Sequence, residues 1–383
     1  MKKNLFILGI AALAFAACSN DEVVEVNQGE AINFRTLVTG VTRATDIDAS
    51  SLSNFYVTAN KSGSSPIVNY FGGTAPATYT KSGDTYTCTT KYYWPSSGDL
   101  DFYAFAPATG TDITRTDSTH FSVTPNATPA SQRDFIYAVV RDQNKTANGN
   151  GVVLNFRHAL SKIIIQLKNT STDKRFTVNN VTLGYIKPTG AFAPVFKTTA
   201  GSQIGFCTNG TLISNTTIAS ETGYYITGAA WTASGTETEY TQVAGTTSYP
   251  ENTTSPVALT NSMILVPQTL TAASQYSAAS AGSDFNGAFI SVELRIQDLS
   301  DNYIIADGSS YVTAMWPLAS ITWLPGHKYT YTLDLAGGGY TLKNADSNVD
   351  LDPVLDGSEI KFVSVTVDNW IDAGDNAVSG PTL

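Results

Sequence analysis

The chain has 383 residues and a formal net charge of −10, with 22 Lys and Arg against 32 Asp and Glu. Nucleic-acid binding needs a basic face that neutralises phosphates, so this balance argues against it. Only 14% of the residues are charged, and the abundance of Thr, Ser, Asn, Gly and aromatic residues favours strands and turns over helices. A chain of this length exceeds one ordinary domain, so we expect two.

Residues 1–18 have the pattern of an export signal. Two lysines precede the apolar run Leu5–Ala14, which is too short to span a membrane. Cys18 follows two alanines, and this resembles a bacterial lipoprotein box in which the cysteine becomes the lipidated first residue. Asp21-Glu22 resembles the surface-export tag of Bacteroidetes-type lipoproteins. A plain signal peptide with an incidental cysteine is the alternative.

The next segment, residues 19–43, contains one clear strand. Ala31–Thr39 alternates with a period of two, and one face carries Ile32, Phe34, Thr36 and Val38. Just after it, Arg43 stands among small residues, where a trypsin-like protease would cut before Ala44. The sequence therefore predicts a removable N-terminal strand, and we expect its removal to deprive the rest of the fold of an edge strand.

The remaining chain reads as short strands separated by turns. The expected strands are Phe55–Ala59, a hairpin within Tyr79–Trp94, Leu100–Ala106, His120–Val123, Asp134–Val140, Val152–Lys168, Val178–Ile186, Met263–Val266, Phe289–Ile296, Tyr329–Leu335 and Glu359–Trp370. Residues 198–260 are rich in Thr, Ser and Gly and predict long loops or weak edge strands. No βαβ rhythm is present, which predicts an all-β chain of two antiparallel β-sandwich domains.

The domain junction is expected within or beside Val152–Lys168. A helix across Arg157–Lys162 is the alternative there, but the β-branched triple Ile163–Ile165 favours a strand. We expect an N-terminal domain of residues 44–158 and a C-terminal domain of residues 159–383.

Motifs for catalysis or for cofactors are not found. The three histidines have no zinc spacing, and nucleophile-elbow, phosphate-loop and dinucleotide motifs are absent. We expect no catalytic residue, no metal and no cofactor. The acidic loop with Asp346, Asp350, Asp352 and Asp356 leaves calcium binding as an alternative to a solvated loop, although its order is not that of a calcium-binding hand. No disulfide between Cys88 and Cys207 is expected.

Several stretches, in their order along the chain, resemble the fimbrillin family, the pilin subunits of Bacteroidales-type (type V) pili. They are the box at Cys18, Thr42-Arg43-Ala44, Trp94 followed by LDFYAFAP, DFIYA (134–138), FRHALSKIIIQLKN (156–169), LVPQTL (265–270), LPGHKYTYTLDL (324–335) and FVSVTVDNW (362–370). The resemblance implies transthyretin-like (Greek-key) topology in both sandwiches. It also implies an outer-membrane lipoprotein precursor, cut between Arg43 and Ala44 by an arginine-specific surface protease.

In this family, the loss of the N-terminal strand implies a groove that a strand of the next subunit fills, head to tail. The candidate donor is Glu359–Trp370 with its tail, and its apolar residues are Phe362, Val363, Val365, Val367 and Trp370. The implied partners are other pilin subunits and the protease, and the implied product is a cell-surface fimbrium for adhesion. Stalk, tip and anchor roles all remain open, and no receptor is implied.

A second hypothesis is a glycan-binding lipoprotein that stays on the cell surface through a lipid at Cys18. It requires an exposed aromatic platform, and Trp94 and Trp231 are the residues to test. The aromatic stretch LDFYAFA is explained more simply by a buried strand.

Overall fold

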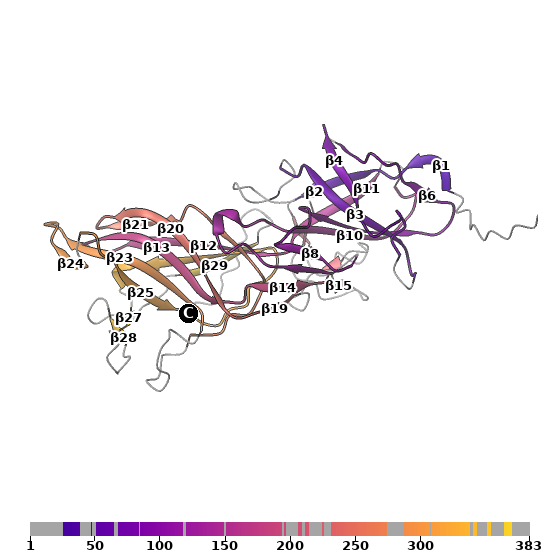
Figure 1. Ribbon diagram of the computed structural model, residues 1–383. Coiled ribbons are helices and arrows are strands. Elements are labelled where there is room, and N and C mark those ends of the chain that lie inside the picture. Colours follow the sequence, from indigo (N-terminus) through magenta and orange to yellow (C-terminus); the bar gives the residue numbers. More distant parts are fainter. Residues whose placement is uncertain are drawn as a thin grey trace, which may run out of the picture.

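In the computed structural model, the described part of the chain comprises residues 26–38, 47, 51–64, 68–83, 85–117, 120–148, 151–193, 195–196, 206–208, 211–213, 224–225, 231–273, 287–306, 308–337, 340–342, 351–353 and 364–369. These residues form an elongated all-β molecule with two domains placed end to end (Figure 1). No helix in the described ranges is long and apolar enough to cross a membrane.

Seven strands build the first domain, and their ladders connect in a closed ring in the order β10-β11-β2-β5-β4-β3-β7. The strands are β2 (Phe34–Val38), β3 (Asn54–Lys61), β4 (Ala77–Ser82), β5 (Thr85–Thr87), β7 (Leu100–Ala106), β10 (Ile136–Gln143) and β11 (Val152–His158). Side chains fill the space enclosed by these strands. The aromatic groups of Phe34 and Phe102, for example, meet across it with centroids 5.1 Å apart. The domain is therefore a packed sandwich. A separate pair joins β1 (Val26–Ala31) to β6 (Tyr93–Pro95).

Two sheets form the second domain. One has the order β21-β12-β26-β29, with β22 also on β12; the other has the order β20-β13-β23-β25-β27-β28, with β24 on β23. The first contains β12 (Ser161–Asn169), β21 (Thr253–Ala258), β22 (Met263–Leu265), β26 (His327–Asp334) and β29 (Ser364–Asn369). The second contains β13 (Lys174–Ile186), β20 (Thr238–Tyr249), β23 (Phe289–Asp298), β24 (Tyr303–Ile305), β25 (Val312–Pro317), β27 (Tyr340–Leu342) and β28 (Leu351–Pro353).

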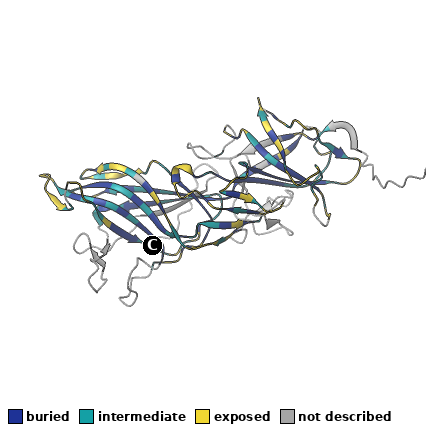
Figure 2. Cartoon of the chain, viewed as in Figure 1, coloured by how far each residue is buried: buried dark blue, intermediate teal, exposed yellow. Residues whose placement is uncertain are grey.

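Alternating side chains of these two sheets enclose the second core. Ile163, Ile165 and Leu167 of β12 face Val181, Ile290 and Val292 of the other sheet in one buried cluster. Figure 2 shows the buried residues along the inner faces of both domains. The strands therefore alternate as period-2 elements with one face on a core. Two pairs depart from the antiparallel expectation, because β2–β11 and β12–β26 run parallel.

A third sheet joins the two domains. It has the order β19-β14-β9-β8, where β8 (Ile113–Arg115) and β9 (Phe121–Val123) precede the junction and β14 (Thr189–Phe192) and β19 (Trp231–Ser234) follow it. Its side chains belong to a core cluster that contains residues of both halves, among them Phe135, Tyr137, Phe192 and Trp231. The covalent connection from β11 to β12 is the pair Ala159 and Leu160, both fully buried.

The remaining short elements are the 3₁₀ turns η1 (Pro129–Ser131) and η4 (Leu335–Gly337) and the pairs β15 (Val195–Phe196) with β18 (Tyr224–Tyr225) and β16 (Phe206–Thr208) with β17 (Thr211–Ile213).

Three local expectations can be compared directly with the strands. The prediction of a strand rather than a helix at Arg157–Lys162 is confirmed, since both β11 and β12 are extended. The expected strand Ala31–Thr39 is wrong in its bounds, because Ile32 and Asn33 belong to neither β1 nor β2 and separate the two strands. Residues 198–260 were expected to form long loops or weak edge strands, and β20 (Thr238–Tyr249) does lie at the edge of its sheet, but it is long and buries Tyr240 and Tyr249.

Candidate functional site: the groove around the N-terminal strand

The N-terminal strand β2 is one of the seven strands of the ring in the first domain, and its two neighbours there are β11 and β5. It runs parallel to β11 over five residue pairs, from Val152–Phe34 to Phe156–Val38. On its other side it meets β5 at one pair, Phe34 with Tyr86. The expectation of an edge strand is therefore wrong, because both neighbours of β2 are strands. Without β2, the ring would open between β11 and β5.

Phe34 is the anchor of this strand. Its side chain is 2% exposed and meets the rings of Tyr79 at 4.8 Å, Phe102 at 5.1 Å and Phe55 at 6.1 Å, all nearly edge to face. Aromatic pairs of this geometry are stabilising beyond their buried area. Burial of one phenylalanine is worth about 2–3 kcal/mol. Desolvation in the same pocket raises the pKa of Tyr79 above its ordinary value of 10.0.

The two residues between β1 and β2, Ile32 and Asn33, are held by backbone hydrogen bonds. Ile32 donates its N–H to the Tyr92 carbonyl at 2.7 Å, and the Asn33 carbonyl accepts from Val152 N–H at 2.8 Å. Gly151, beside Val152, has φ +91°, and a Cβ there would lie 3.1 Å from the Asn33 oxygen. Glycine permits both this left-handed conformation and the close approach. Ile32 itself is 2% exposed, so it and Phe34 together fill the groove.

The chain on the far side of the expected cut has a separate attachment. Ile47 donates its N–H to Asp134 Oδ2 at 3.1 Å, and the same oxygen lies 2.7 Å from His158 Nδ1. Both side chains of this pair are almost wholly buried. Residue 47 therefore has a backbone attachment to Asp134, which is not part of β2, in addition to its packing against the core of the first domain. Sequence reasoning assigned no role to this pair, although both residues stand in stretches that carry the family resemblance.

The predicted site residues fall into three groups. Ile32 and Phe34 are buried, and Thr36 and Val38 take their places in the backbone of β2; the removal of this strand stays a prediction. Cys18, Arg43 and Ala44 lie outside the described residues, as do Phe362, Val363 and Trp370 of the donor segment. Val365 and Val367 belong to β29, which pairs with β26 of its own chain from His327–Asn369 to Thr332–Ser364.

The tryptophans proposed for glycan stacking are not at the surface. Trp94 is 4% exposed and packs edge-on against Phe102. Trp231 is 6% exposed and lies against Phe192 in the core between the domains. The stretch LDFYAFA is buried along its whole length as β7. These rings serve the cores, so none of them forms the exposed platform that glycan binding requires.

Metal binding at the acidic loop cannot be placed on the structure, because Asp346, Asp350 and Asp356 lie outside the described residues. Asp352 belongs to the backbone of β28. Within the described ranges, no group of three or more His, Cys, Asp or Glu side chains is gathered as a metal site.

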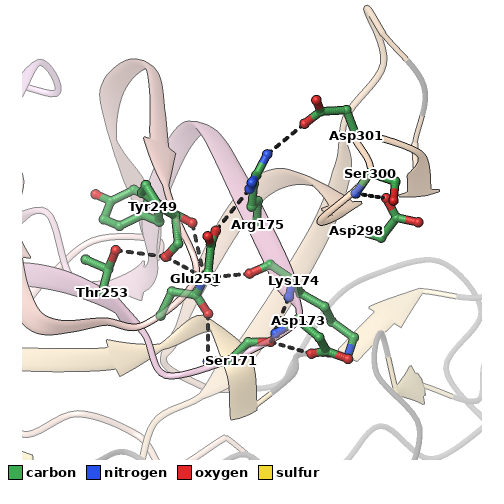
Figure 3. A network of polar contacts seen from close by, with 12 residues as sticks. Ser171, Asp173, Lys174, Arg175, Tyr249, Glu251, Thr253, Asp298, Ser300 and Asp301 are labelled. Carbon is green, nitrogen blue, oxygen red and sulfur yellow. Dashed lines mark hydrogen bonds and ion pairs between the residues drawn. The ribbon is translucent and has the colours of Figure 1, made fainter.

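The end of the second domain opposite the groove is tied by a polar network (Figure 3). Arg175 Nε donates to Glu251 at 3.0 Å and Nη1 donates to Asp301 at 2.8 Å. These three residues come from β13 and two loops, so one guanidinium joins three segments. The hydrogen bond from Arg175 lowers the pKa of Glu251 below its ordinary value. The network closes the end of the sandwich and contains no arrangement for catalysis.

The two sandwiches, with a strand of the N-terminal segment completing the first, define an all-β protein of two sandwich domains. The fimbrillin-like family model matches residues 42–370, and the chain belongs to this family. Its members are fimbrial, non-enzymatic structural proteins, which confirms the resemblance inferred from the sequence.

The solved structures to which this chain is similar are distant from it in sequence. A fimbrial protein from Bacteroides vulgatus is 14% identical, with 89% of this chain and 99% of that chain covered and a TM-score of 0.48. A candidate cell adhesion protein from Bacteroides uniformis is 16% identical, with 89% and 98% covered and a TM-score of 0.41. Among proteins with curated annotation, none has a sequence that matches this chain.

Proposed function

We propose that this protein is a fimbrial subunit that is exported as a lipoprotein precursor, cut after Arg43 and polymerised by donor-strand exchange. The observation that carries the proposal is the place of β2. A strand that lies before Arg43 in the sequence completes the ring of the first domain and buries Phe34 in an aromatic pocket.

Removal of β2 has two effects that favour assembly. The backbone groups of β11 along Val152–Phe156 lose their partners, and the pocket around Phe34 is opened to water. Unpaired strand edges bind further strands, and β-strand addition supplies backbone hydrogen bonds together with pockets for alternate side chains. A strand from a second copy fills the groove, and because this contact is head to tail it produces a fibre.

The attachment at Ile47 supports the same sequence of events. Asp134 holds the chain at residue 47, so the segment after the cut stays in place when the segment before it departs. The family match also begins at residue 42, beside the proposed cut. The lipid at Cys18 serves the precursor during export and leaves with residues 18–43.

The donor in this proposal is the C-terminal segment Glu359–Trp370 with its tail. In the isolated chain, part of this segment is β29 and pairs with β26. Donation therefore requires β29 to exchange its partner within the chain for a partner in the next subunit.

The experiment is the identification of the N-terminal residue of the protein on native cells by mass spectrometry. We expect Ala44 in fibres, and in the Arg43→Ala variant we expect an intact precursor and no fibres. Arg43→Lys tests the protease, because an enzyme specific for arginine leaves it uncut. Thr42→Ala is the matched control and is processed normally. Unchanged fibres from Arg43→Ala, or a lipidated Cys18 on the assembled protein, would refute the processing step.

The glycan-binding alternative is not proposed, because Trp94 and Trp231 are both buried.

A further inference from the structure

We propose that the donor enters the groove in one register, with Ile360 and Phe362 of a second copy in the places of Ile32 and Phe34. This inference rests on the proposed function and specifies which residues of the donor carry it. The donor then runs in the direction of β2, parallel to β11.

The two segments share a pattern. The N-terminal segment reads Ala-Ile-Asn-Phe-Arg-Thr-Leu-Val at residues 31–38, and the C-terminal segment reads Glu-Ile-Lys-Phe-Val-Ser-Val-Thr at residues 359–366. Aligned in this way, Ile and Phe are identical, Thr36 corresponds to Ser364, and Leu37 corresponds to Val365. The spacing Ile-x-Phe occurs at only three places in the chain, beginning at Ile32, Ile204 and Ile360. Only the third lies in the C-terminal segment.

The shape of the pocket explains why an aromatic residue is needed. Phe34 is enclosed by Phe55, Tyr79 and Phe102 with ring centroids 4.8–6.1 Å away. A smaller residue in this pocket would leave a cavity and lose contacts with all three rings. The tail of residues 371–383 contains no aromatic residue. It is therefore a poor substitute for β2 at this point, whereas Phe362 restores the same side chain.

The neighbouring position on the opposite face gives an independent indication. In the precursor, Arg35 is the partner of Val153 on β11, and Val153 is 37% exposed. In the proposed register, Val363 takes the position of Arg35. The exchange thus places an apolar residue beside an exposed valine, and apolar contacts between neighbouring strands stabilise a sheet. The donor fits this neighbour better than the strand that it replaces.

The exchange has a cost within the donor subunit. Ile360 and Phe362 precede β29, but Ser364, Val365 and Thr366 are paired with Thr332, Tyr331 and Thr330 of β26. These three pairs must open before the segment can occupy the groove over its full length. The same pairs hold the segment on its own chain before assembly. The donor segment therefore stays paired with β26 of its own chain until an open groove of another subunit offers it alternative backbone partners.

The register is tested with cysteine pairs in the full chain, expressed in cells that assemble fibres, with Cys88 and Cys207 replaced by serine. Paired Cα atoms of neighbouring strands lie about 4.8 Å apart, within the range that a disulfide spans. Val153→Cys with Val363→Cys should give ladders of covalent oligomers on a non-reducing gel, and reduction should return them to monomer. Val153→Cys with Lys361→Cys and Val153→Cys with Val365→Cys are out-of-register controls and should give monomer.

The outcomes distinguish a failure of the proposed register from a failure of the proposed function. If the Val153→Cys, Val363→Cys variant forms fibres that dissociate to monomer without reductant, the proposed register is wrong. It is also wrong if ladders form with cysteine at 361 or 365 in place of 363. In both cases the fibres themselves leave strand donation standing. A parent chain that retains residues before Ala44 and forms no fibre overturns the proposed function, and the register with it.

Discussion

His158 Nδ1 lies 2.7 Å from Asp134 Oδ2, with the two side chains 3% and 0% exposed. A second pair in the same domain has the same chemistry in a different setting. His120 Nδ1 lies 2.8 Å from Asp117 Oδ2, with side chains 54% and 55% exposed. The two pairs form a matched comparison of the same contact inside the protein and at its surface.

We predict that Asp134→Ala lowers the free energy of unfolding by about 2–4 kcal/mol, because a buried polar contact is lost and the Ile47 N–H loses its acceptor. Asp117→Ala should change it by less than about 0.5 kcal/mol. Chemical denaturation of the two variants measures both values. Equal effects of the two substitutions would contradict the anchoring role of Asp134.

A second prediction concerns the sheet between the domains. A Cβ at Gly190 of β14 would collide with Val266 Cγ1 and approach Trp231 Cε3 at 2.8 Å. Overpacking of this kind costs about 1–3 kcal/mol, so Gly190→Ala should lower the melting temperature. Gly337→Ala is the control, since nothing lies within 4 Å of a Cβ there. A Gly190→Ala protein as stable as the control would show that the packing between the domains is loose.

A third prediction concerns pH. Desolvation lowers the pKa of His327 below its ordinary value of 6.5, against a smaller opposing effect of its hydrogen bond to the Pro325 carbonyl. The unfolded chain therefore binds the proton more readily than the folded chain. Stability from neutral His327 is present above about pH 6.5 and is lost as the pH falls below that value.

The advantage of the wild type over His327→Asn should shrink between pH 8 and pH 5.5, as measured by urea denaturation at each pH. The comparison of two proteins removes the contributions of the other histidines and of the carboxylates. A constant difference across this interval would contradict the assigned direction of the shift.

A fourth prediction concerns the network of Figure 3. The Arg175 hydrogen bond is the largest cause that lowers the pKa of Glu251, so Arg175→Gln should raise that pKa toward its ordinary value of 4.5. The NMR titration of the Glu251 carboxyl carbon measures the change. Asp301→Asn, which removes the other partner of Arg175, is the control and should move the Glu251 pKa less. An unchanged titration in Arg175→Gln would contradict this assignment.

The sequence predicted those parts of the fold in which alternation is strong. Phe289–Ile296 was expected as a strand and is β23, and LDFYAFA was expected as a buried strand and is β7. Both signals are local, because alternation and apolar runs report which side chains are buried. The length of β20 was not predicted, because its residues are mostly Thr, Ser, Gly and Glu and its buried residues are Tyr240, Gln242 and Tyr249 rather than a run of apolar side chains.

Pairing between distant strands could not be predicted in the same way. Nothing in residues 34–38 indicates that β11 is the neighbour of β2, or that β2 has a paired strand on each side. The sheet that joins β9 to β14 is likewise a contact between segments about 70 residues apart. Of the site, the residues Ile32 and Phe34 were predicted, whereas the attachment of Ile47 to Asp134 requires coordinates.

The connection between the domains determines how the molecule responds to mechanical force. The two residues that link β11 to β12 are fully buried, and β9 pairs with β14 beside them. In the fibre proposed above, a pull along its axis would be carried by a packed core and a hydrogen-bonded sheet rather than by a flexible tether. We therefore expect each subunit of that fibre to move as one body, so that extension under load comes from the contacts between subunits.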